Sequence, residues 1–358
     1  MPIRRLWWSK WTFRFKTMVR YRLLFLTSAP IILTLCALVA ITLYWSVHYT
    51  WQGALIDVDE RLDVADNSIH LIQSQQAYNV QAFAESYNFR VKLTSNGSKE
   101  DFTRWVSENK KRYKLDFLRW RSVEQMDKKL EYLDLTHKES FFNVLTQDEL
   151  NELDRNLAKQ AEVPMLNGHD VETRGLVSRT VVSIRDKHDH VIGFLDGGIL
   201  LNNSTQLVDQ ISNLIYPQRD GFNRRIGTVT VFLDDLRVST NVPLSSEDSA
   251  GRAIGTRVSN EVHTKVLNEG KEWLDRAYVY DAWYITAYQP IHDQFDNVIG
   301  MLYTGYLIWP LIQTYLTNLG EISITIVLLL LASGLIVHRG ARDLFNPIER
   351  IHKVVKLV

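Results

Sequence analysis

The stretch IRDKHDHVIGFLDGGIL at 184–200 decides the fold, because the chain repeats it as IHDQFDNVIGMLYTGYL at 291–307. The two stretches align without a gap, and nine of their 17 positions are identical, among them Gly193 with Gly300. Each copy has the pattern of a polar turn that leads into a buried strand. The repeat therefore predicts two copies of one antiparallel α+β module.

The chain around the two copies alternates between helical and strand patterns. A stripe of apolar residues spaced by three and four runs from Leu55 to Tyr87, and no proline or glycine interrupts residues 54–96, which predicts one long helix. The other expected elements are helix 99–113, strand 115–121, a polar and helix-rich segment 122–165 with a helix start at Thr146, strands 176–185 and 191–201, helix 204–215, hairpin 228–242, helix 258–268 and strands 273–280, 283–291 and 298–307.

The long helical stripe has two interpretations. Its heptad spacing is typical of a stalk helix that pairs with the same helix in a second copy of the chain. Alternatively, one helix packs its stripe on its own domain, and both arrangements can hold at different heights. We expect some contact between two copies, and therefore a homodimer.

Two apolar stretches near the ends predict membrane helices. Residues 23–47 hold 25 positions without a charge, and about 20 apolar residues span a bilayer. The stretch is too long for a cleaved signal peptide, and no small-x-small site follows it. Residues 322–337 form ~24 Å of helix, and their apolar run favours a membrane span over a buried soluble helix. We therefore predict a two-pass protein with transmembrane helices at 23–47 and within 309–338.

The charges flanking these stretches predict the orientation. Residues 1–22 contain seven basic and no acidic residues, and residues 339–358 contain five basic and two acidic ones. Basic flanks stay in the cytoplasm. The remaining segment, 23–338, keeps 29 basic and 39 acidic residues. Both termini are thus expected inside and residues ~48–318 outside. The aromatic-rich tail 1–22 is either an anchor on membrane lipid or a free basic tail.

Several stretches together resemble the double Cache sensor domain of bacterial receptors. Those resembling its membrane-proximal unit are TVFLDDLRVSTNV at 230–242, GRAIGTRVSNEV at 251–262, WYITAYQPIHD at 283–293 and VIGMLYTGYL at 298–307. ETRGLV at 172–177, with the strand pair after it, resembles the distal unit. The resemblance implies a PAS-like antiparallel sheet in each module. It places the stalk helix and distal module at 48–222 and the proximal module at 223–308.

The C-terminal stretch NPIERIHKVVKLV at 346–358 resembles the start of a HAMP linker. Its apolar residues step by three and four, which is the seam of a parallel coiled coil. The resemblance implies a continuation into an output domain, most often a histidine kinase and less often a diguanylate cyclase or a chemotaxis signalling rod. It also implies a homodimer in the bacterial inner membrane, paired through the stalk, the transmembrane helices and HAMP.

No catalytic motif is present: the chain has no P-loop, no G-x-G-x-x-G and no H-E-x-x-H. We therefore expect the chain to signal rather than to catalyse. His188 and His190, beside two aspartates, form a pattern that can hold a metal, but the second copy has Phe295 and Asn297 in the equivalent turn. This difference favours a plain solvated turn. We expect no metal, no cofactor and no nucleic acid.

The resemblance implies a small-molecule pocket over the sheet of at least one module. A small carboxylate or an amino acid is the leading ligand class, because the guanidinium fork of arginine pairs with carboxylates. Trp283 and Tyr284 point to opposite faces of their strand, so only one of them can face a pocket. The proximal candidates are Arg237, Thr240, Arg257, Arg276, Trp283, Tyr284, Tyr288 and Tyr303. The distal candidates are Trp120, Arg174, Arg179 and Asp196.

Each of these residues also has a structural interpretation, as a surface ion pair or as ordinary core. A further alternative for the whole exterior region is a domain that recognises another exterior protein and has no small-molecule pocket.

Overall fold

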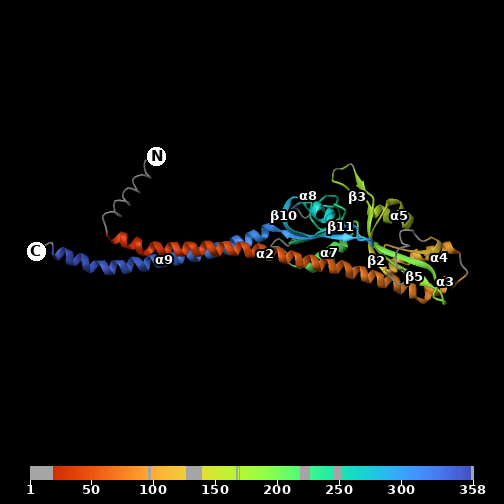
Figure 1. Ribbon diagram of the computed structural model, residues 1–358, viewed down its shortest axis with the longest axis horizontal. Helices are drawn as coiled ribbons and strands as arrows, with labels where there is room; N and C mark the ends of the chain where they lie inside the picture. The colour runs from red at the N-terminus through yellow and green to blue at the C-terminus, as the bar shows by residue number, and fades with distance from the viewer. Residues whose placement is uncertain are drawn as a thin grey trace. The chain divides into compact units, whose positions relative to one another are not determined.

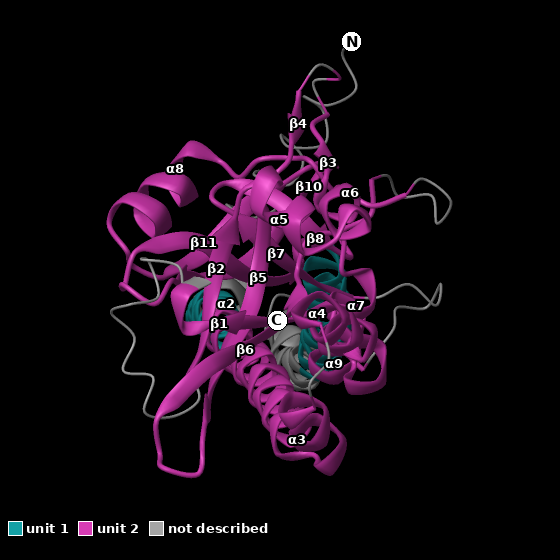
Figure 2. Cartoon of the chain, turned by 90° about the vertical axis from the view of Figure 1, so that its right-hand side faces the viewer, with its two compact units in different colours: residues 1–53, 309–358 teal, residues 54–308 magenta. Residues whose placement is uncertain are grey.

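The computed structural model describes residues 19–95, 98–125, 139–166, 168, 170–217, 226–244 and 251–355. The chain divides into two compact units, coloured separately in Figure 2. One unit is Ala54–Ile308, and the other joins the two ends, Met1–Gly53 and Trp309–Val358.

The unit formed by the two ends contains parts of two long helices, α2 (Val19–Glu85) and α9 (Ile308–Val355). Both have windows long and apolar enough to cross a membrane, and no residue of these windows is buried. Leu33 is 70 % exposed and Ile336 71 % exposed, which is unfavourable in water. Residues 1–18 of the predicted basic tail lie outside the described residues. The same holds for the side chains of the HAMP-like seam.

The unit Ala54–Ile308 contains two antiparallel sheets (Figure 1). The distal sheet has the strand order β1-β6-β5-β2, with β1 at Phe117–Ser122, β2 at Glu139–Leu145, β5 at Gly175–Arg185 and β6 at Val191–Leu200. The proximal sheet has the order β8-β7-β11-β10-β9, with β7 at Gly227–Leu233, β8 at Leu236–Thr240, β9 at Trp273–Val279, β10 at Ala282–His292 and β11 at Val298–Leu307. An α+β architecture with antiparallel sheets is confirmed.

The internal repeat corresponds to the central hairpin of each sheet. Ile184 pairs with Gly193 in the β5–β6 hairpin, and Ile291 pairs with Gly300 in the β10–β11 hairpin. The register of both hairpins shifts directly after the isoleucine. Neither glycine has room for a side chain, because a Cβ at Gly193 would lie 2.4 Å from Trp120 and one at Gly300 2.2 Å from a backbone oxygen. The two copies therefore share the same backbone conformation at this position.

The turns of the two hairpins are also alike. In each, an aspartate carboxylate, of Asp186 or Asp293, accepts two backbone N–H groups at 2.7–2.9 Å. Asp189 and Asp296, three residues on, both have φ of 65°. The backbone hydrogen bond from His190 lowers the pKa of Asp186. The Asp186 carboxylate thus stabilises the turn by accepting its backbone N–H groups.

Helix α2 lies against the same face of both sheets. Its side chains meet the proximal sheet first, where Asp66 is hydrogen-bonded to Gln289 of β10. Farther along, the Gln76 amide donates to the Ser178 carbonyl and the Thr180 hydroxyl of β5, both at 3.0 Å. From Val58 to Phe83 the predicted helical stripe is therefore largely buried within its own chain, with Leu62 2 % exposed, whereas Tyr87 at its end is 80 % exposed.

The long helix ends earlier than its sequence predicts. α2 stops at Glu85, and Ser86 has extended backbone angles and caps a separate helix, α3 (Tyr87–Thr94), by accepting from the Phe89 N–H. Serine is a favoured N-cap, so the break needs neither proline nor glycine. The segment predicted as polar and helix-rich holds strand β2, which is a second correction. The helix start predicted at Thr146 is confirmed, and Thr146 and Glu149 form a capping box there.

The remaining elements cover the sheets or connect them. The distal sheet is accompanied by α4 (Lys99–Glu108), η1 (Lys110–Tyr113), η2 (Val123–Gln125), α5 (Gln147–Leu153) and α6 (Arg155–Ala161). A small two-stranded arm consists of β3 (Val163–Pro164) and β4 (Val171–Glu172). α7 (Thr205–Ile215) leads to the proximal sheet, whose far face is covered by α8 (Asn260–His263) and η4 (Thr264–Asn268).

Candidate ligand site

The proximal sheet buries an unusually polar face on the side away from α2. Strand alternation and register put three tyrosines and several threonines on this face, together with Arg237. Val262 and Val266 of the covering helices belong to the same core cluster. The polar members are Thr228, Thr230, Arg237, Thr240, Tyr284, Thr286, Tyr288 and Tyr303.

Arg237 has the most costly position on this face. It is 2 % exposed, and its guanidinium lies 5.1 Å above the Phe232 ring. One guanidinium nitrogen donates to the Thr256 hydroxyl, whereas Nε has no partner. None of the described residues supplies a carboxylate to it. Burial lowers the pKa of Arg237, because the charged form is poorly solvated there. Such a cation favours an anion as its neighbour.

The tyrosines beside Arg237 add neutral hydroxyl groups. The rings of Tyr288 and Tyr303 lie 4.7 Å apart, and the Tyr303 and Thr228 hydroxyls are 3.1 Å apart. Burial raises the pKa of Tyr284 to about 12 and raises those of Tyr288 and Tyr303 further. All three hydroxyls therefore stay protonated at neutral pH and can donate hydrogen bonds. The face combines one cation with several neutral donors, which suits an anionic ligand.

The other proximal candidates are placed differently. Thr240 is buried, but its hydroxyl already contacts the Thr230 hydroxyl at 2.6 Å. Arg257 is about half exposed and pairs with Asp235 at the β7–β8 turn. Arg276 and Trp283 lie on the opposite face of the sheet, where the guanidinium stacks 5.7 Å above the exposed indole. The structure thus brings Tyr284, and not Trp283, to Arg237.

The distal sheet carries a different charged cluster at the equivalent position. Asp196 is fully buried, and the Arg179 guanidinium donates two hydrogen bonds of 2.8 Å to its carboxylate. Arg119 and Arg121 of β1 approach the same carboxylate at 2.8 and 3.8 Å. Neither arginine was among the site residues predicted from the sequence. Their alternation in LDFLRWR, on a strand facing β6, was the available indication. This cluster holds its own carboxylate, unlike the Arg237 face.

The two other distal candidates are not part of this cluster. Trp120 alternates with Arg119 and Arg121 and so lies on the opposite face, packed against Phe89 and Phe102. Arg174 lies at the junction of the modules, where it pairs with Glu172 and with Asp234, each at 2.8 Å. The predicted distal set is therefore divided among three places.

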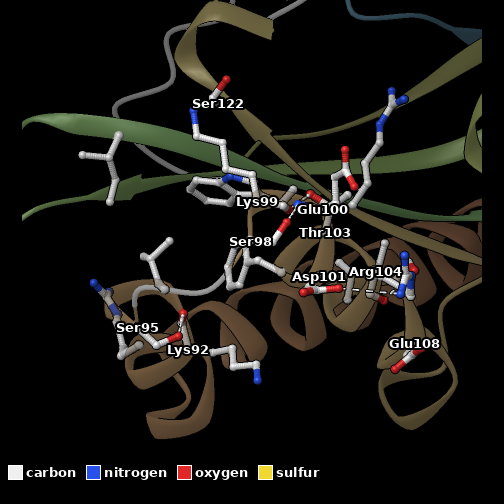
Figure 3. Close-up of a pocket in the computed structure, with 18 of the residues that line it drawn as sticks. Lys92, Ser95, Ser98, Lys99, Glu100, Asp101, Thr103, Arg104, Glu108 and Ser122 are labelled. Atoms are coloured by element: carbon white, nitrogen blue, oxygen red, sulfur yellow. Dashed lines mark hydrogen bonds and ion pairs between the residues drawn. The ribbon is translucent and has the colours of Figure 1, made fainter.

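A wide cleft opens at the distal module, with a volume of about 1620 Å³. Its walls come from α3, α4, β1 and the β5–β6 turn, and Figure 3 shows the α3–α4 side chains that line it. Charges of both signs face it, including the pair of Asp101 with Arg104 at 3.6 Å. The cleft has no single charge preference. Arg119 of the Asp196 cluster and the predicted candidate Trp120 line it, but no residue of the Arg237 face does.

Comparison with known proteins identifies one part of the chain. Residues 199–317, from the end of β6 to the first turns of α9, match the family model described as single Cache domain 3. The proximal module is therefore similar to a Cache domain. Its sheet, its covering helices and the Arg237 face all fall inside the matched segment. No curated protein matches the chain.

Solved sensor domains are similar to the chain at low identity. The periplasmic domain of Vibrio cholerae LuxQ has 13 % identity and a TM-score of 0.38, covering 71 % of this chain and 99 % of its own. The V. cholerae DctB sensor domain has 10 % identity and a TM-score of 0.34, covering 72 % of this chain and 98 % of its own. The Pseudomonas aeruginosa PctB ligand-binding domain, solved with L-Arg, has 10 % identity and a TM-score of 0.31, covering 72 % of this chain and 94 % of its own.

Proposed function

We propose that the chain is a transmembrane sensory receptor whose proximal Cache module binds a small carboxylate at Arg237. One observation carries this proposal: a fully buried guanidinium has no carboxylate partner among the described residues. An unpaired buried charge costs several kcal/mol. A bound carboxylate supplies the opposite charge and can accept two parallel hydrogen bonds from the guanidinium.

The polar face also limits the ligand class. Asp196 of the distal sheet is the only buried carboxylate among the described residues, so the Arg237 face offers no buried acid to a ligand ammonium group. An ammonium group buried there would lack a partner. We therefore favour a carboxylate without an amino group over an amino acid. Tyr284, Tyr288 and Tyr303 would donate to the remaining ligand oxygens.

Strand β11 offers a route from this site to the membrane helices. Tyr303 belongs to the ligand face, whereas the Tyr306 hydroxyl, on the other face, donates to the Ala54 carbonyl of α2 at 3.1 Å. α9 starts directly after β11, at Ile308. A shift of β11 on ligand binding would act on α2 and α9 together, and would bias two packings of the output helices.

The wider organisation is part of the same proposal. Residues 23–47 and the span within 309–338 cross the bacterial inner membrane, residues ~48–318 face the exterior, and both ends lie in the cytoplasm. The segment 339–358 begins a HAMP linker that leads to an output domain, for which we favour a histidine kinase over a diguanylate cyclase or a chemotaxis rod.

The test is thermal unfolding of the full chain in lipid nanodiscs, with acetate, succinate, citrate and amino acids. A ligand at 100-fold its Kd should stabilise the native state by about 2.7 kcal/mol. Arg237→Met should melt higher than the parent without ligand, because it removes a buried unpaired charge, and should not respond to carboxylates. Arg276→Met on the outer face is the matched control. A carboxylate response that survives Arg237→Met would refute the site.

The distal cleft favours a second candidate function, recognition of another exterior protein. Its volume of about 1620 Å³ exceeds the range of about 300–1,000 Å³ typical of small-molecule pockets. Under this alternative no compound shifts the melting curve. A partner protein then binds the full chain, and reversing the charge at Lys99 or Arg104 in the cleft wall weakens the complex.

A further inference from the structure

Two segments of different modules meet beside Arg237. We call residues 251–258 the strap. It runs along the outer edge of β8, where the backbones of Arg257 and Leu236 form an isolated antiparallel β-bridge. The arm of the distal module, formed by β3, β4 and the residues Met165 and Leu166 after β3, lies on the strap's other side. The strap is therefore held between the proximal sheet and the distal module.

The strap determines where the Arg237 guanidinium points. The Arg237 N–H donates to the Thr256 carbonyl at 2.8 Å, and the Gly255 N–H donates to the Arg237 carbonyl at 2.9 Å. The guanidinium donates to the Thr256 hydroxyl, which itself donates to the Ala253 carbonyl at 2.8 Å. The hydroxyl proton is thus committed to Ala253, and its oxygen accepts from Arg237.

The arm packs on the strap at one glycine. The Leu166 N–H donates to the Gly255 carbonyl at 3.3 Å. A Cβ at Gly255 would lie 2.1 Å from the Pro164 carbonyl oxygen, and φ of +80° disfavours any side chain there. The arm backbone therefore contacts the residue next to Thr256 directly.

Ion pairs at the base of the arm attach it to the β7–β8 turn. Arg174 bridges Glu172 of the arm and Asp234 of the turn. Burial disfavours the ionised form of Glu172, but the hydrogen bonds and charge of Arg174 outweigh it and lower the pKa of Glu172. Arg257 of the strap pairs with Asp235, and its guanidinium lies 3.7 Å from the Met165 sulfur. Two adjacent aspartates thus hold both the arm and the strap.

We propose that the distal arm is a positioning element of the proximal ligand site, acting on Arg237 through Gly255 and Thr256. The inference rests on the proposed function, because it assumes that Arg237 holds the ligand. An arginine held in its binding orientation loses less conformational freedom on binding. Displacing the arm frees the strap, lets Thr256 release the guanidinium and weakens anion binding. The distal module thereby sets the affinity of the proximal site.

The test uses charge reversal at the base of the arm, in the full chain in nanodiscs. Arg174→Asp and Asp234→Arg are made singly and together, with acetate and succinate as probes. Each single change should weaken probe binding about tenfold and speed amide hydrogen exchange at Gly255 and Arg237, and the pair should restore both. Arg276→Asp, with the same change of charge on the outer face, should leave both unchanged. Single reversals that leave affinity and exchange within twofold of the parent overturn the proposal.

Gly255→Ala is a second variant that leaves all charges in place. The clash with Pro164 should displace the arm, weaken probe binding and speed amide exchange at Arg237. The variant should still show a cooperative thermal unfolding transition, which shows that it folds. Unchanged exchange at Arg237 in this variant also overturns the proposal. If the parent binds neither probe, the proposed carboxylate function fails, and the exchange pattern alone still decides whether the arm positions Arg237.

Discussion

At the scale of residues, one repeated position explains why the two modules differ. Asp196 and Tyr303 occupy the same place in the repeat, at the centre of the buried sheet face. Asp196 gives the distal arginines a counter-charge, whereas with Tyr303 at this place none of the described residues supplies a carboxylate to Arg237. Two copies of one backbone thus differ in that the distal face contains a buried carboxylate, whereas none of the described residues supplies one to the Arg237 face.

Removing the charge of Asp196 should therefore destabilise the protein strongly. In Asp196→Asn, Arg119 and Arg179 lose the carboxylate that they grip, and breaking such a buried pair costs about 3–5 kcal/mol. Urea unfolding of the parent and the variant measures the difference. Asp275→Asn, exposed on β9, is the control and should cost less than about 0.5 kcal/mol. A cost below about 1 kcal/mol for Asp196→Asn would show that the cluster does not need this charge.

The tyrosine at the equivalent position should matter for the ligand as much as for the fold. Tyr303→Phe removes one hydroxyl hydrogen bond, to Thr228, which contributes about 1 kcal/mol to stability. The same hydroxyl is a proposed donor to the carboxylate, so acetate binding should weaken about fivefold. Tyr278→Phe on the exposed face should change neither quantity. Titration calorimetry checks the prediction, and unchanged acetate affinity in Tyr303→Phe would remove Tyr303 from the site.

At the scale of elements, the stripe buried under the sheets leaves a second stripe of α2 exposed. Ile56, Val64, Leu71 and Tyr78 are 58, 44, 71 and 63 % exposed, and the last three recur every seven residues. Heptad spacing of exposed apolar residues favours pairing with a second copy. The homodimer expected from the sequence would thus use this stripe and not the one from Leu55 to Tyr87. With Cys36→Ser, Leu71→Cys should cross-link in membranes, whereas the buried Leu62→Cys should not. Absent cross-linking at 71 would exclude pairing through this stripe.

The same elements show what the sequence could and could not predict. The hairpins were predictable because their turns, glycines and strand alternation are local and occur twice. The end of α2 at Ser86 was not, because a serine cap competes with an uninterrupted apolar stripe, and only packing decides. Strand β2 was hidden in a charged neighbourhood, although Phe141 and Phe142 favour a strand. The pairing of Arg119 with Asp196, and of Arg174 with Asp234, needs the register between distant strands.

At the scale of the whole molecule, buried tyrosines should make the folded unit Ala54–Ile308 sensitive to alkali. Burial raises the pKa of Tyr216, Tyr284, Tyr288, Tyr303 and Tyr306 above the ordinary value of 10.0, to about 12 for Tyr284 and further for the others. Above pH 10 these tyrosines ionise in the unfolded chain but stay protonated in the folded one. The unfolded state then binds fewer protons, so stability falls as pH rises.

Each such tyrosine can contribute a slope of up to about 1.4 kcal/mol per pH unit between pH 10 and its folded pKa. Urea midpoints at pH 8, 9, 10 and 11 should therefore be level up to pH 9 and fall steeply beyond 10. Tyr303→Phe should reduce the slope by close to one proton, because it deletes one of the groups whose pKa burial raises most. Tyr278→Phe, exposed on β9, should keep the parent slope. A slope unaffected by Tyr303→Phe would mean that water reaches the Arg237 face in the folded state, and the low-polarity environment on which its affinity for an anion depends would be absent.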